Sequence, residues 1–293
     1  MGKYGMSGWN RRGAIGAGLT ALGAFASLGS QTALAQQGDG GVPLDIETAK
    51  GRLRTFMMLR GALDERLTMS WVSARYYGVV EDRMDPLFAV VSAVFSRSRQ
   101  LADGRFEAVN AEIAWFTDPV SGDALDSYRN PYTGEDVEVP QGGYAPSRVR
   151  FGPELELRLE KEIPGLTMEH EVLPFDLRGD DLWVTERTRT AMQVPGVAKP
   201  FRYSESNTYH ASRAAMEAPG VTRVPVSVAF TNVCSWRPWM SMGDRPGHLT
   251  ATGVGAHNAD WAQMPPAWIA ATRARRPEVL ADPAALLAPL WDA

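Results

Sequence analysis

The chain has 293 residues, of which 44% are hydrophobic, 22% charged and 9% aromatic, and its formal net charge is −4. This balance excludes disordered, collagen-like and coiled-coil chains, and the absence of a basic block from the body argues against a nucleic-acid partner. The single cysteine, Cys234, excludes an intramolecular disulfide and a zinc cluster built from cysteines.

The first 35 residues have the pattern of an export signal. Three positive charges and no acid are followed by a run rich in Gly, Ala and Leu at 13–28, and then by the small-x-small pattern at 33–35, which predicts cleavage before Gln36. The pair Arg11-Arg12 resembles a twin-arginine signal; the alternatives are an ordinary secretory signal and a membrane anchor. The apolar run is shorter than roughly 18 residues, which counts against a stable membrane span.

We therefore expect a periplasmic protein whose partner during export is the twin-arginine machinery. Cleavage would leave one domain, residues 36–293, and would take the formal net charge from −4 to −7, because residues 1–35 hold three basic residues and no acidic ones. The oligomeric state stays open at this point.

The body of the chain has the alternation typical of half-buried strands, in short runs separated by Gly, Pro, Asp and Asn. Helical patterns are confined to 46–53, 265–273 and 282–291. With no helical crossovers between about ten strands, we expect a mainly β fold, a single antiparallel β-barrel of calycin or lipocalin shape with short terminal helices. The candidate strands are 52–59, 67–80, 87–96, 105–117, 135–139, 155–160, 167–173, 182–192, 201–211, 225–230 and 247–254.

Two motifs resemble a known family. The first is segment 111–135, with an acidic strand and the turns Asp-Pro-Val-Ser-Gly at 118–122 and Asn-Pro-Tyr-Thr-Gly at 130–134. The second is Ser-Trp-Arg-Pro-Trp-Met-Ser-Met-Gly at 235–243, followed by Gly-His-Leu at 247–249. Together they are similar to DUF1838, a bacterial and fungal family of unknown function, over about residues 50–280. The resemblance implies no particular reaction.

The two turns of the first motif are best interpreted as hairpin construction. Asp and Asn side chains accept hydrogen bonds from backbone amides two residues on, Pro presets φ, and Gly takes a left-handed position. The alternative is that Tyr128 or Asn130 faces a ligand, and both are kept as candidate ligand-binding residues.

The histidine spacing does not favour a metal. None of the four histidines forms an H-x-H, H-x-x-x-H or H-E-x-x-H pattern, so we expect no metal and no cofactor. His170 shares a strand face with Met168 and Val172, and an imidazole on an apolar, inward face is a candidate general acid or base. The alternative is a core histidine.

Two neighbouring strands carry further candidates. Alternation places Arg187 and Arg189 on one face of 182–192, where they could bind a carboxylate or a phenolate, or simply line a solvated outer face. If this strand pairs with 201–211, either arginine could instead oppose Glu205 in an ion pair.

On 201–211, one face carries four residues suited to the wall of a polar pocket: Tyr203, Glu205, Asn207 and Tyr209. In the second motif, Trp236 and Trp239 could stack on a planar ligand, with a core plug as the alternative.

These residues suggest two functions. The first is a cofactor-independent lyase or isomerase that acts on a small aromatic or terpenoid-like molecule in a barrel pocket. His170 would move a proton, Glu205 would assist, Tyr203 or Tyr209 would donate to an oxygen, and Arg187 would hold an anionic group. The second is a periplasmic carrier of a small hydrophobic or aromatic ligand.

Overall fold

The structure is a computed structural model that describes residues 41–140, 142–143, 145–161, 163–193 and 199–292. The predicted signal peptide, residues 1–35, lies outside the described residues.

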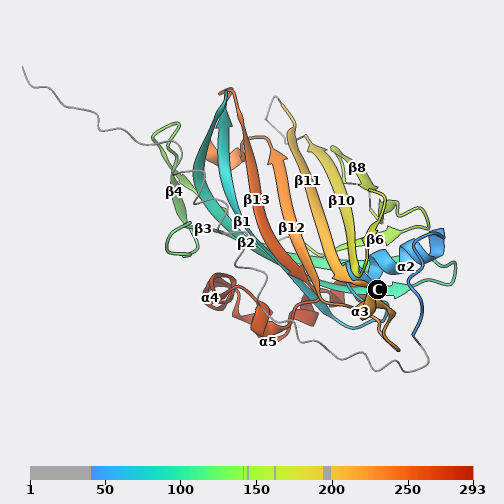
Figure 1. Ribbon diagram of the computed structural model, residues 1–293. Coiled ribbons are helices and arrows are strands. Elements are labelled where there is room, and N and C mark those ends of the chain that lie inside the picture. The colour runs from blue at the N-terminus through green and yellow to red at the C-terminus, as the bar shows by residue number, and fades with distance from the viewer. Residues whose placement is uncertain (1–40, 141, 144, 162, 194–198, 293) are drawn as a thin grey trace, which may run out of the picture. The chain divides into compact units, whose positions relative to one another are not determined.

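Antiparallel strands make up most of the described chain (Figure 1). The thirteen strands of the described residues are β1 (Thr68–Val80), β2 (Arg83–Gln100), β3 (Phe106–Thr117), β4 (Ser127–Arg129), β5 (Asp136–Glu138), β6 (Ser147–Phe151), β7 (Leu157–Leu159), β8 (Leu166–Val172), β9 (Asp176–Arg178), β10 (Asp181–Met192), β11 (Phe201–Ser212), β12 (Val226–Cys234) and β13 (His248–His257). The strands β4, β6 and β9 were not predicted, since three to five residues give only a weak signal of a period of two. The strands β5 and β7, each of three residues, were predicted within 135–139 and 155–160.

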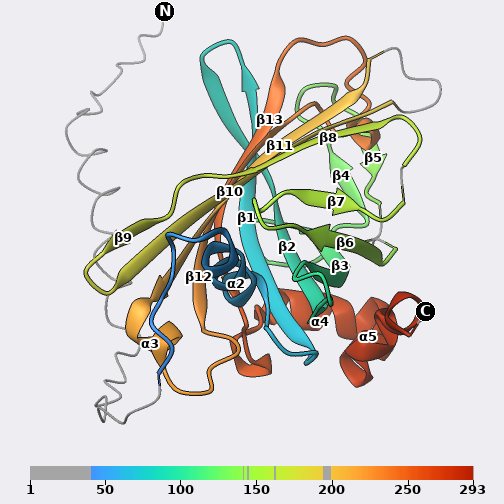
Figure 2. The ribbon, with the colours of Figure 1, turned by 90° about the vertical axis from the view of Figure 1, so that its right-hand side faces the viewer.

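Eleven of these strands form one sheet, in the order β7-β6-β3-β2-β1-β13-β12-β11-β10-β8, with β9 paired to β10. All pairings are antiparallel, and the sheet curls into a nearly closed barrel (Figures 1 and 2). The strands β4 and β5 make a separate two-stranded ribbon. The expected mainly β, antiparallel barrel with short terminal helices is confirmed.

A helix, α2 (Ala49–Arg60), occupies the segment where 52–59 was predicted to be a strand, so that prediction is wrong. Thr48 caps the helix by accepting a hydrogen bond from the Gly51 amide at 3.0 Å. Its buried side chains include Phe56 and Leu59, whose spacing of three fits a helical face rather than a strand.

The helix packs inside the sheet and covers one end of the barrel interior (Figure 2). Its apolar residues share a cluster with Val149 and Phe151 of β6 on one side and with Leu182 of β10 and Val226 of β12 on the other. Because α2 joins two distant stretches of sheet, it fixes the curvature at this end.

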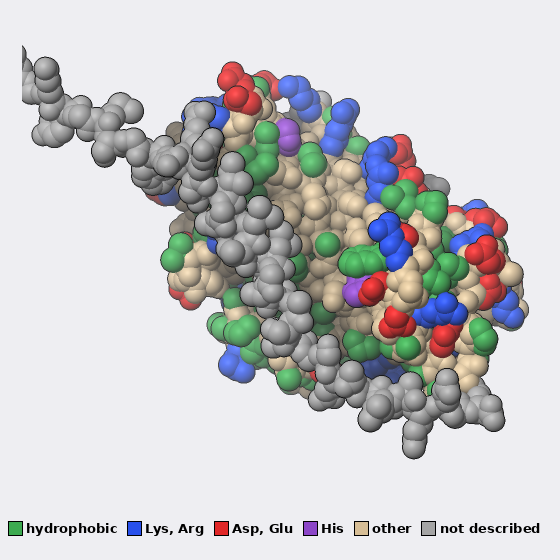
Figure 3. Space-filling model, viewed as in Figure 1, with side chains coloured by type: hydrophobic (Ala, Val, Ile, Leu, Met, Phe, Trp, Pro, Cys, Tyr) green, Lys and Arg blue, Asp and Glu red, His purple; other side chains and the backbone are tan. Residues whose placement is uncertain are grey.

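The outer face of β2 and β3 is covered by C-terminal helices, among them α4 (Pro266–Arg275) and α5 (Pro277–Ala281) (Figure 1). Trp268 of α4 is fully buried and donates from Nε1 to the Ile113 carbonyl at 2.8 Å. The remaining short helices are α3 (Arg213–Glu217), η2 (Pro238–Met240), η3 (Trp261–Gln263), η4 (Pro283–Leu286) and α6 (Ala288–Trp291). By contrast, the outer face of β11 to β13 shows mainly small uncharged side chains (Figure 3).

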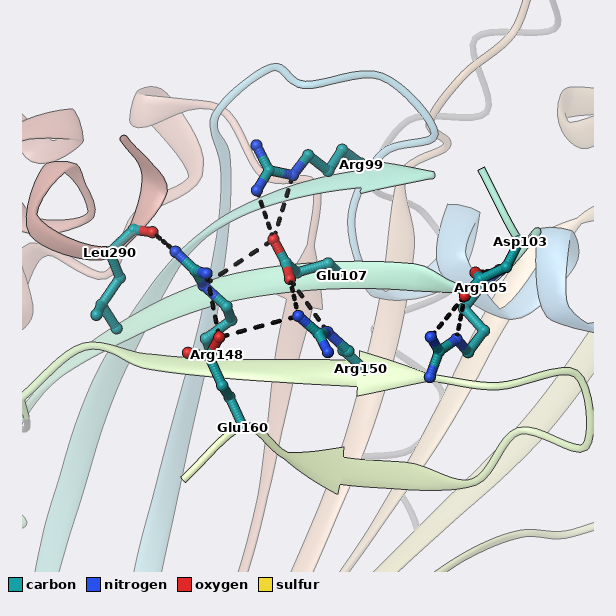
Figure 4. Close-up of polar contacts among 8 residues, drawn as sticks. All are labelled: Arg99, Asp103, Arg105, Glu107, Arg148, Arg150, Glu160 and Leu290. Carbon is teal, nitrogen blue, oxygen red and sulfur yellow. Dashed lines mark hydrogen bonds and ion pairs between the residues drawn. The ribbon is translucent and has the colours of Figure 1, made fainter. Parts of the chain in front are cut away.

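An ion-pair cluster on the outer face fastens the chain's last helix to the barrel (Figure 4). Glu107 of β3, only 2% exposed, pairs with Arg99 of β2 at 2.7 Å and with Arg150 of β6 at 3.1 Å. Arg148 lies beside Glu107 and donates to the Leu290 carbonyl in α6. The cluster therefore links the three strands β2, β3 and β6 with the helix α6 around one buried carboxylate.

The structure confirms that the two predicted turns build hairpins. The Asp118 carboxylate accepts from the amides of Val120 and Ser121, each at 2.8 Å. Gly122 and Gly134 have φ values of 79° and 72°, the left-handed region that favours glycine.

The barrel interior has three layers along its length. Apolar side chains surround α2 at one end, and an aromatic cluster that includes Tyr76, Phe88 and Trp239 fills the other. Between them, the strand register brings polar side chains to the inner faces, among them Ser92 of β2, Glu112 of β3 and Glu205 of β11. Polar groups in this position are unusual for a barrel core and identify the middle layer as the place to look for a site.

Candidate functional site

The inner face of β11 supplies the centre of the polar layer. Tyr203 donates from its hydroxyl to Glu205 Oε2 at 2.8 Å, and Asn207 donates from Nδ2 to Oε1 at 3.4 Å. The sequence prediction that Tyr203, Glu205, Asn207 and Tyr209 share a face agrees with the β10–β11 and β11–β12 registers, and that face is the inner one.

Glu205 has an unusual ionisation. Burial raises its pKa to about 7; the nearby charges of Glu186 and Glu112 act in the same direction, whereas the Tyr203 hydrogen bond and Arg60 lower it. The residue is only partly buried, so it contacts space that water can enter. A carboxyl group that titrates near neutral pH inside an enclosed, water-accessible layer is suited to give or take a proton.

A second carboxyl comes from β3. Ser92 of β2 donates to Glu112 Oε1 at 2.5 Å, and burial raises the pKa of Glu112, while the Ser92 hydrogen bond and the charge of Arg237 lower it. Like Glu205, Glu112 is partly buried. The polar layer therefore contains two carboxyl groups whose protonated forms are favoured.

A third carboxyl behaves in the opposite way. Burial alone would raise the pKa of Glu186, but the charge of Arg60 and the hydrogen bonds from His170 and Tyr209 lower it to about 2. His170 Nε2 lies 2.8 Å from Glu186 Oε1, the Tyr209 hydroxyl donates to Oε2, and Arg60 pairs with Oε1. Glu186 is thus a fixed negative charge within the barrel.

His170 belongs to this Glu186 cluster. Its side chain is 2% exposed, and its Nδ1 is buried with no hydrogen-bond partner in the part of the chain that the structure describes. The structure therefore brings His170 and Tyr209 together, but it directs His170 to Glu186 rather than to water-accessible space.

Next to this cluster lies His257 of β13, whose ring centroid is 4.9 Å from that of Tyr209. Its Nδ1 lies 3.1 Å from the Leu59 carbonyl of α2. Burial, helped by the charge of Arg60, lowers the pKa of His257 to about 4, so this imidazole is neutral at pH 7.

The prediction that Arg187 holds an anionic group inside the barrel is wrong. Arg187 neighbours Glu186 in β10, and the period of two sends their side chains to opposite faces. Arg187 pairs with Glu171 on the outer face at 3.1 Å. The residue opposite Glu205 in the β10–β11 register is Thr188, so the suggested ion pair of Arg187 or Arg189 with Glu205 is not formed either.

Asn130, a predicted ligand-binding residue, is instead part of the fold. It is fully buried, donates from Nδ2 to the Met240 carbonyl at 2.6 Å, and accepts at Oδ1 from the Tyr132 amide at 3.0 Å. Because its amide group is used within the protein, the alternative of a ligand contact is wrong, and Asn130 joins the second turn to η2.

The aromatic residues of the two motifs meet at one end of the barrel. Trp239 packs on Phe88 with ring centroids 5.3 Å apart and on Tyr128 at 6.1 Å, so Trp239 and Tyr128 form a core plug, the alternative given for the tryptophan. Trp236 lies 5.2 Å from Tyr132 and lines an open cleft.

That cleft, with a volume of about 1090 Å³, opens at the rim beside the aromatic cluster. Inward-facing residues that line it include Met168, Thr190 and Tyr203, so the cleft reaches Tyr203, the residue whose hydroxyl donates to Glu205. Cys234 also lines it, but this residue is 3% exposed and burial raises its pKa to about 11, which fits the small hydrophobic role expected of it.

Arg237, which no pattern singled out, lies where the cleft meets the plug. Its guanidinium carbon is 5.4 to 5.7 Å from the ring centroids of Tyr76, Phe116, Phe201 and Tyr203. Its Nη2 donates to the Tyr76 hydroxyl at 2.7 Å. Four rings therefore surround one buried cation.

Several site residues escaped sequence reasoning for identifiable reasons. Glu186 shares the inner face of β10 with Leu182 and Val184. The alternation in the sequence already placed it on that apolar face, so it could have been chosen as a candidate. Arg60 lies directly after the segment 52–59, which was predicted as a strand. Glu112 and Arg237 lie within the two family motifs, where the turn residues and the tryptophans drew attention instead.

Among the described residues, no three or more His, Cys, Asp or Glu side chains are arranged to hold a metal ion. No helix in the same part of the chain has the length and apolar character needed to cross a membrane.

Comparison with known sequences supports the resemblance found in the two motifs. No curated protein matches the chain. The sequence profile of a family described as a protein of unknown function matches residues 64–288, which include both motifs and every strand of the described residues. The chain belongs to the DUF1838 family.

Proposed function

We propose that this protein is an enzyme that moves a proton on a small, largely apolar molecule held in the barrel, as a cofactor-independent lyase or isomerase. The observation that carries this proposal is Glu205, a partly accessible interior carboxyl whose pKa is raised to about 7. A group with this pKa is half ionised near neutral pH, where it serves both as base and as acid.

The surrounding residues have distinct roles in this proposal. Glu205 takes a proton from the substrate, and Tyr203, which donates to Glu205, stabilises the carboxylate before the transfer. Glu112, whose pKa is raised, supplies an acid from another strand of the same layer. A base and an acid held in one layer are what an isomerisation or an elimination needs, because a proton leaves at one atom and arrives at another.

The Glu186 cluster acts through Glu205. Glu186 remains ionised, and its negative charge raises the pKa of Glu205. In this account His170 and Tyr209 are positioning residues that hold Glu186, and the proton transfer first suggested for His170 is assigned to Glu205.

A carrier of a small hydrophobic or aromatic ligand is the second candidate. The cleft of about 1090 Å³ favours it, because Met168, Phe201 and Trp236 supply apolar contact area at the rim. A carrier would retain its ligand without changing it.

Proton exchange distinguishes the two candidates. The purified protein would be incubated in heavy water with a small-molecule extract of its host, and compounds that gain deuterium or change structure would be identified by mass spectrometry. We expect such compounds with the wild type and at least about 100-fold slower exchange with Glu205→Gln, since general acid–base catalysis contributes about that much. Glu171→Gln, an outer-face variant with the same charge change, should match the wild type.

A ligand retained in stoichiometric amount, with neither deuterium uptake nor conversion, would establish the carrier instead. Exchange that is unchanged in Glu205→Gln would leave an enzyme but remove Glu205 from its mechanism.

We also propose that the protein works in the periplasm after twin-arginine export. The support is the sequence of residues 1–35, with Arg11-Arg12 ahead of a weakly apolar run. Replacing both arginines by lysine should keep the protein in the cytoplasmic fraction of its host, and unchanged export would contradict the proposal.

A further inference from the structure

Arg237 lines the rim cleft, and its surroundings bear on the charge of a ligand that could bind there. This guanidinium is enclosed by four rings and donates to the neutral Tyr76 hydroxyl. Its Nε is buried and has no hydrogen-bond partner, and no carboxylate of the described residues lies within ion-pair distance. Arg237 is therefore a largely enclosed cation that forms no ion pair among the described residues, although its charge also acts on Glu112.

Such an arrangement is costly for a protein that only has to fold. A buried charge is normally paired, and leaving it without a partner is unfavourable. Contacts with aromatic faces recover only a part of this cost. A neutral side chain of similar size would fill the space without the cost, so the charge itself needs a reason.

The cleft beside Arg237 supplies that reason. Its described lining contains the basic residues Arg189, Lys199, Arg202, Arg237 and Arg245, but only two acidic ones, Glu169 and Asp244.

Both acidic residues are already paired, Glu169 with Arg189 at 3.7 Å and Asp244 with Lys199 at 3.4 Å. Three arginines of the lining thus have no carboxylate partner among the described residues. The rim where β10 ends and β11 begins shows the same concentration of Lys and Arg side chains (Figure 3). This positive cleft belongs to a chain whose formal net charge is −4.

We propose that the rim cleft binds an organic anion, with its carboxylate or similar oxyanion at Arg237 and its apolar body against Phe201 and Trp236. Guanidinium groups bind planar oxyanions through paired N–H donors. Arg202 and Arg245, both exposed at the rim, attract the anion before it reaches Arg237.

This proposal rests on the proposed function in one respect only, namely that the bound anion is the substrate of the enzyme. Tyr203 connects the two sites, because its ring faces Arg237 while its hydroxyl donates to Glu205. An anion anchored at Arg237 would extend its apolar part along the inner wall toward Glu205. Binding at the rim and proton transfer at Glu205 are separate measurements.

Two fluorescent probes test the charge preference directly. Anilinonaphthalene sulfonate carries an anionic group on an apolar body, and phenylnaphthylamine has the same ring system without the sulfonate. Titrated into the wild-type protein, the sulfonate should bind at least about tenfold more tightly than the neutral probe, as expected for a charge-assisted hydrogen bond. Arg237→Gln should remove this preference and retain binding of the neutral probe.

Two further variants control for surface charge and folding. Arg187→Gln removes one positive charge from the outer face, away from the cleft, and should leave both affinities unchanged. The double variant Arg202→Gln/Arg245→Gln leaves the aromatic surroundings of Arg237 intact and should weaken sulfonate binding about threefold or more, with neutral-probe binding unchanged.

The double variant keeps the proposal testable if Arg237→Gln fails to fold. Equal wild-type affinities for the two probes, or a sulfonate preference that survives in both the Arg237 and the rim variants, would overturn it. Glu205→Gln should keep the preference, so loss of deuterium exchange in that variant and loss of charge preference in Arg237→Gln report on the two proposals independently.

Discussion

Glu186 and Glu205, on neighbouring strands and the same inner face, have opposite ionisation. Arg60, His170 and Tyr209 contact Glu186 and lower its pKa to about 2. Among the described residues no cation forms an ion pair with Glu205, and burial raises its pKa to about 7, although the charge of Arg60 lowers it in part. Pairs of carboxyl groups whose surroundings separate their pKa values are typical of acid–base sites, with one group kept charged and the other free to exchange a proton.

The first prediction concerns the fixed charge. Glu186→Gln should lower the free energy of unfolding by about 3 kcal/mol, because Arg60 would remain largely buried without its partner. Urea unfolding at neutral pH measures this, with Glu171→Gln as the matched control, expected within about 0.5 kcal/mol of wild type because its ion pair is exposed. Equal stability of the two variants would show that the Glu186 cluster does not hold the fold.

The second prediction uses the pH dependence of stability. Between pH 4.5 and about 7 the folded protein keeps a proton on Glu205 that the unfolded chain has lost, so this group lowers wild-type stability as pH rises. Glu205→Gln lacks this contribution. Its stability relative to wild type should therefore rise across that range by up to about 3 kcal/mol and become constant above pH 7.

Urea midpoints of both proteins across this pH range provide the measurement. The comparison cancels other titrating groups, among them His257, whose pKa is lowered to about 4 in both. A difference between the proteins that does not vary with pH would mean that Glu205 ionises normally.

At this scale, alternation was informative about which residues share a face but not about which face is inner. It grouped Tyr203, Glu205, Asn207 and Tyr209 correctly, yet it gave Arg187 a role that belongs to the opposite side of β10. Partners such as Arg60 and Glu186 are 126 positions apart, and a local pattern holds no information about such a contact.

Among the elements, the helix α2 is the main departure from the sequence prediction. Segment 52–59 carries apolar residues at spacings that suit a short strand as well as a helix. Residues 55–59 are all buried, so this part of the segment lacks the exposed positions that would have shown a helical period. The long strands β1, β2, β3, β10 and β11 were predictable because many consecutive residues alternate there.

The third prediction tests the role of α2 as the support for one end of the interior. Phe56 is fully buried, with its ring 5.7 Å from Phe151 and 6.4 Å from Tyr209. Phe56→Ala should lower the free energy of unfolding by about 3 to 5 kcal/mol through the cavity that it leaves. Lys50→Ala, on the exposed side of the same helix, should change it by less than about 0.5 kcal/mol. Similar losses in both variants would contradict the packing of α2 inside the sheet.

At the scale of the whole molecule, the barrel separates stability from chemistry by layers. Apolar packing at α2, the aromatic plug at the other end and the helices outside β2 and β3 form the core. The middle layer contains the partly buried carboxyl groups of Glu112 and Glu205, and the rim cleft carries the positive charge. Strand counts were sufficient to predict the barrel, whereas this layering depends on register and on the placement of α2.

The central claim is that Glu205 exchanges protons with a bound molecule. The most direct test follows deuterium uptake into a responsive compound from heavy water as a function of pH, with wild type, Glu205→Gln and Glu171→Gln. If Glu205 is the base, the rate of deuterium uptake with the wild type and with Glu171→Gln should rise with pH to a plateau, with a midpoint near the pKa of about 7. With Glu205→Gln, uptake should be much slower and should not rise with pH in this way. The same pH profile and rate in Glu205→Gln would contradict the account.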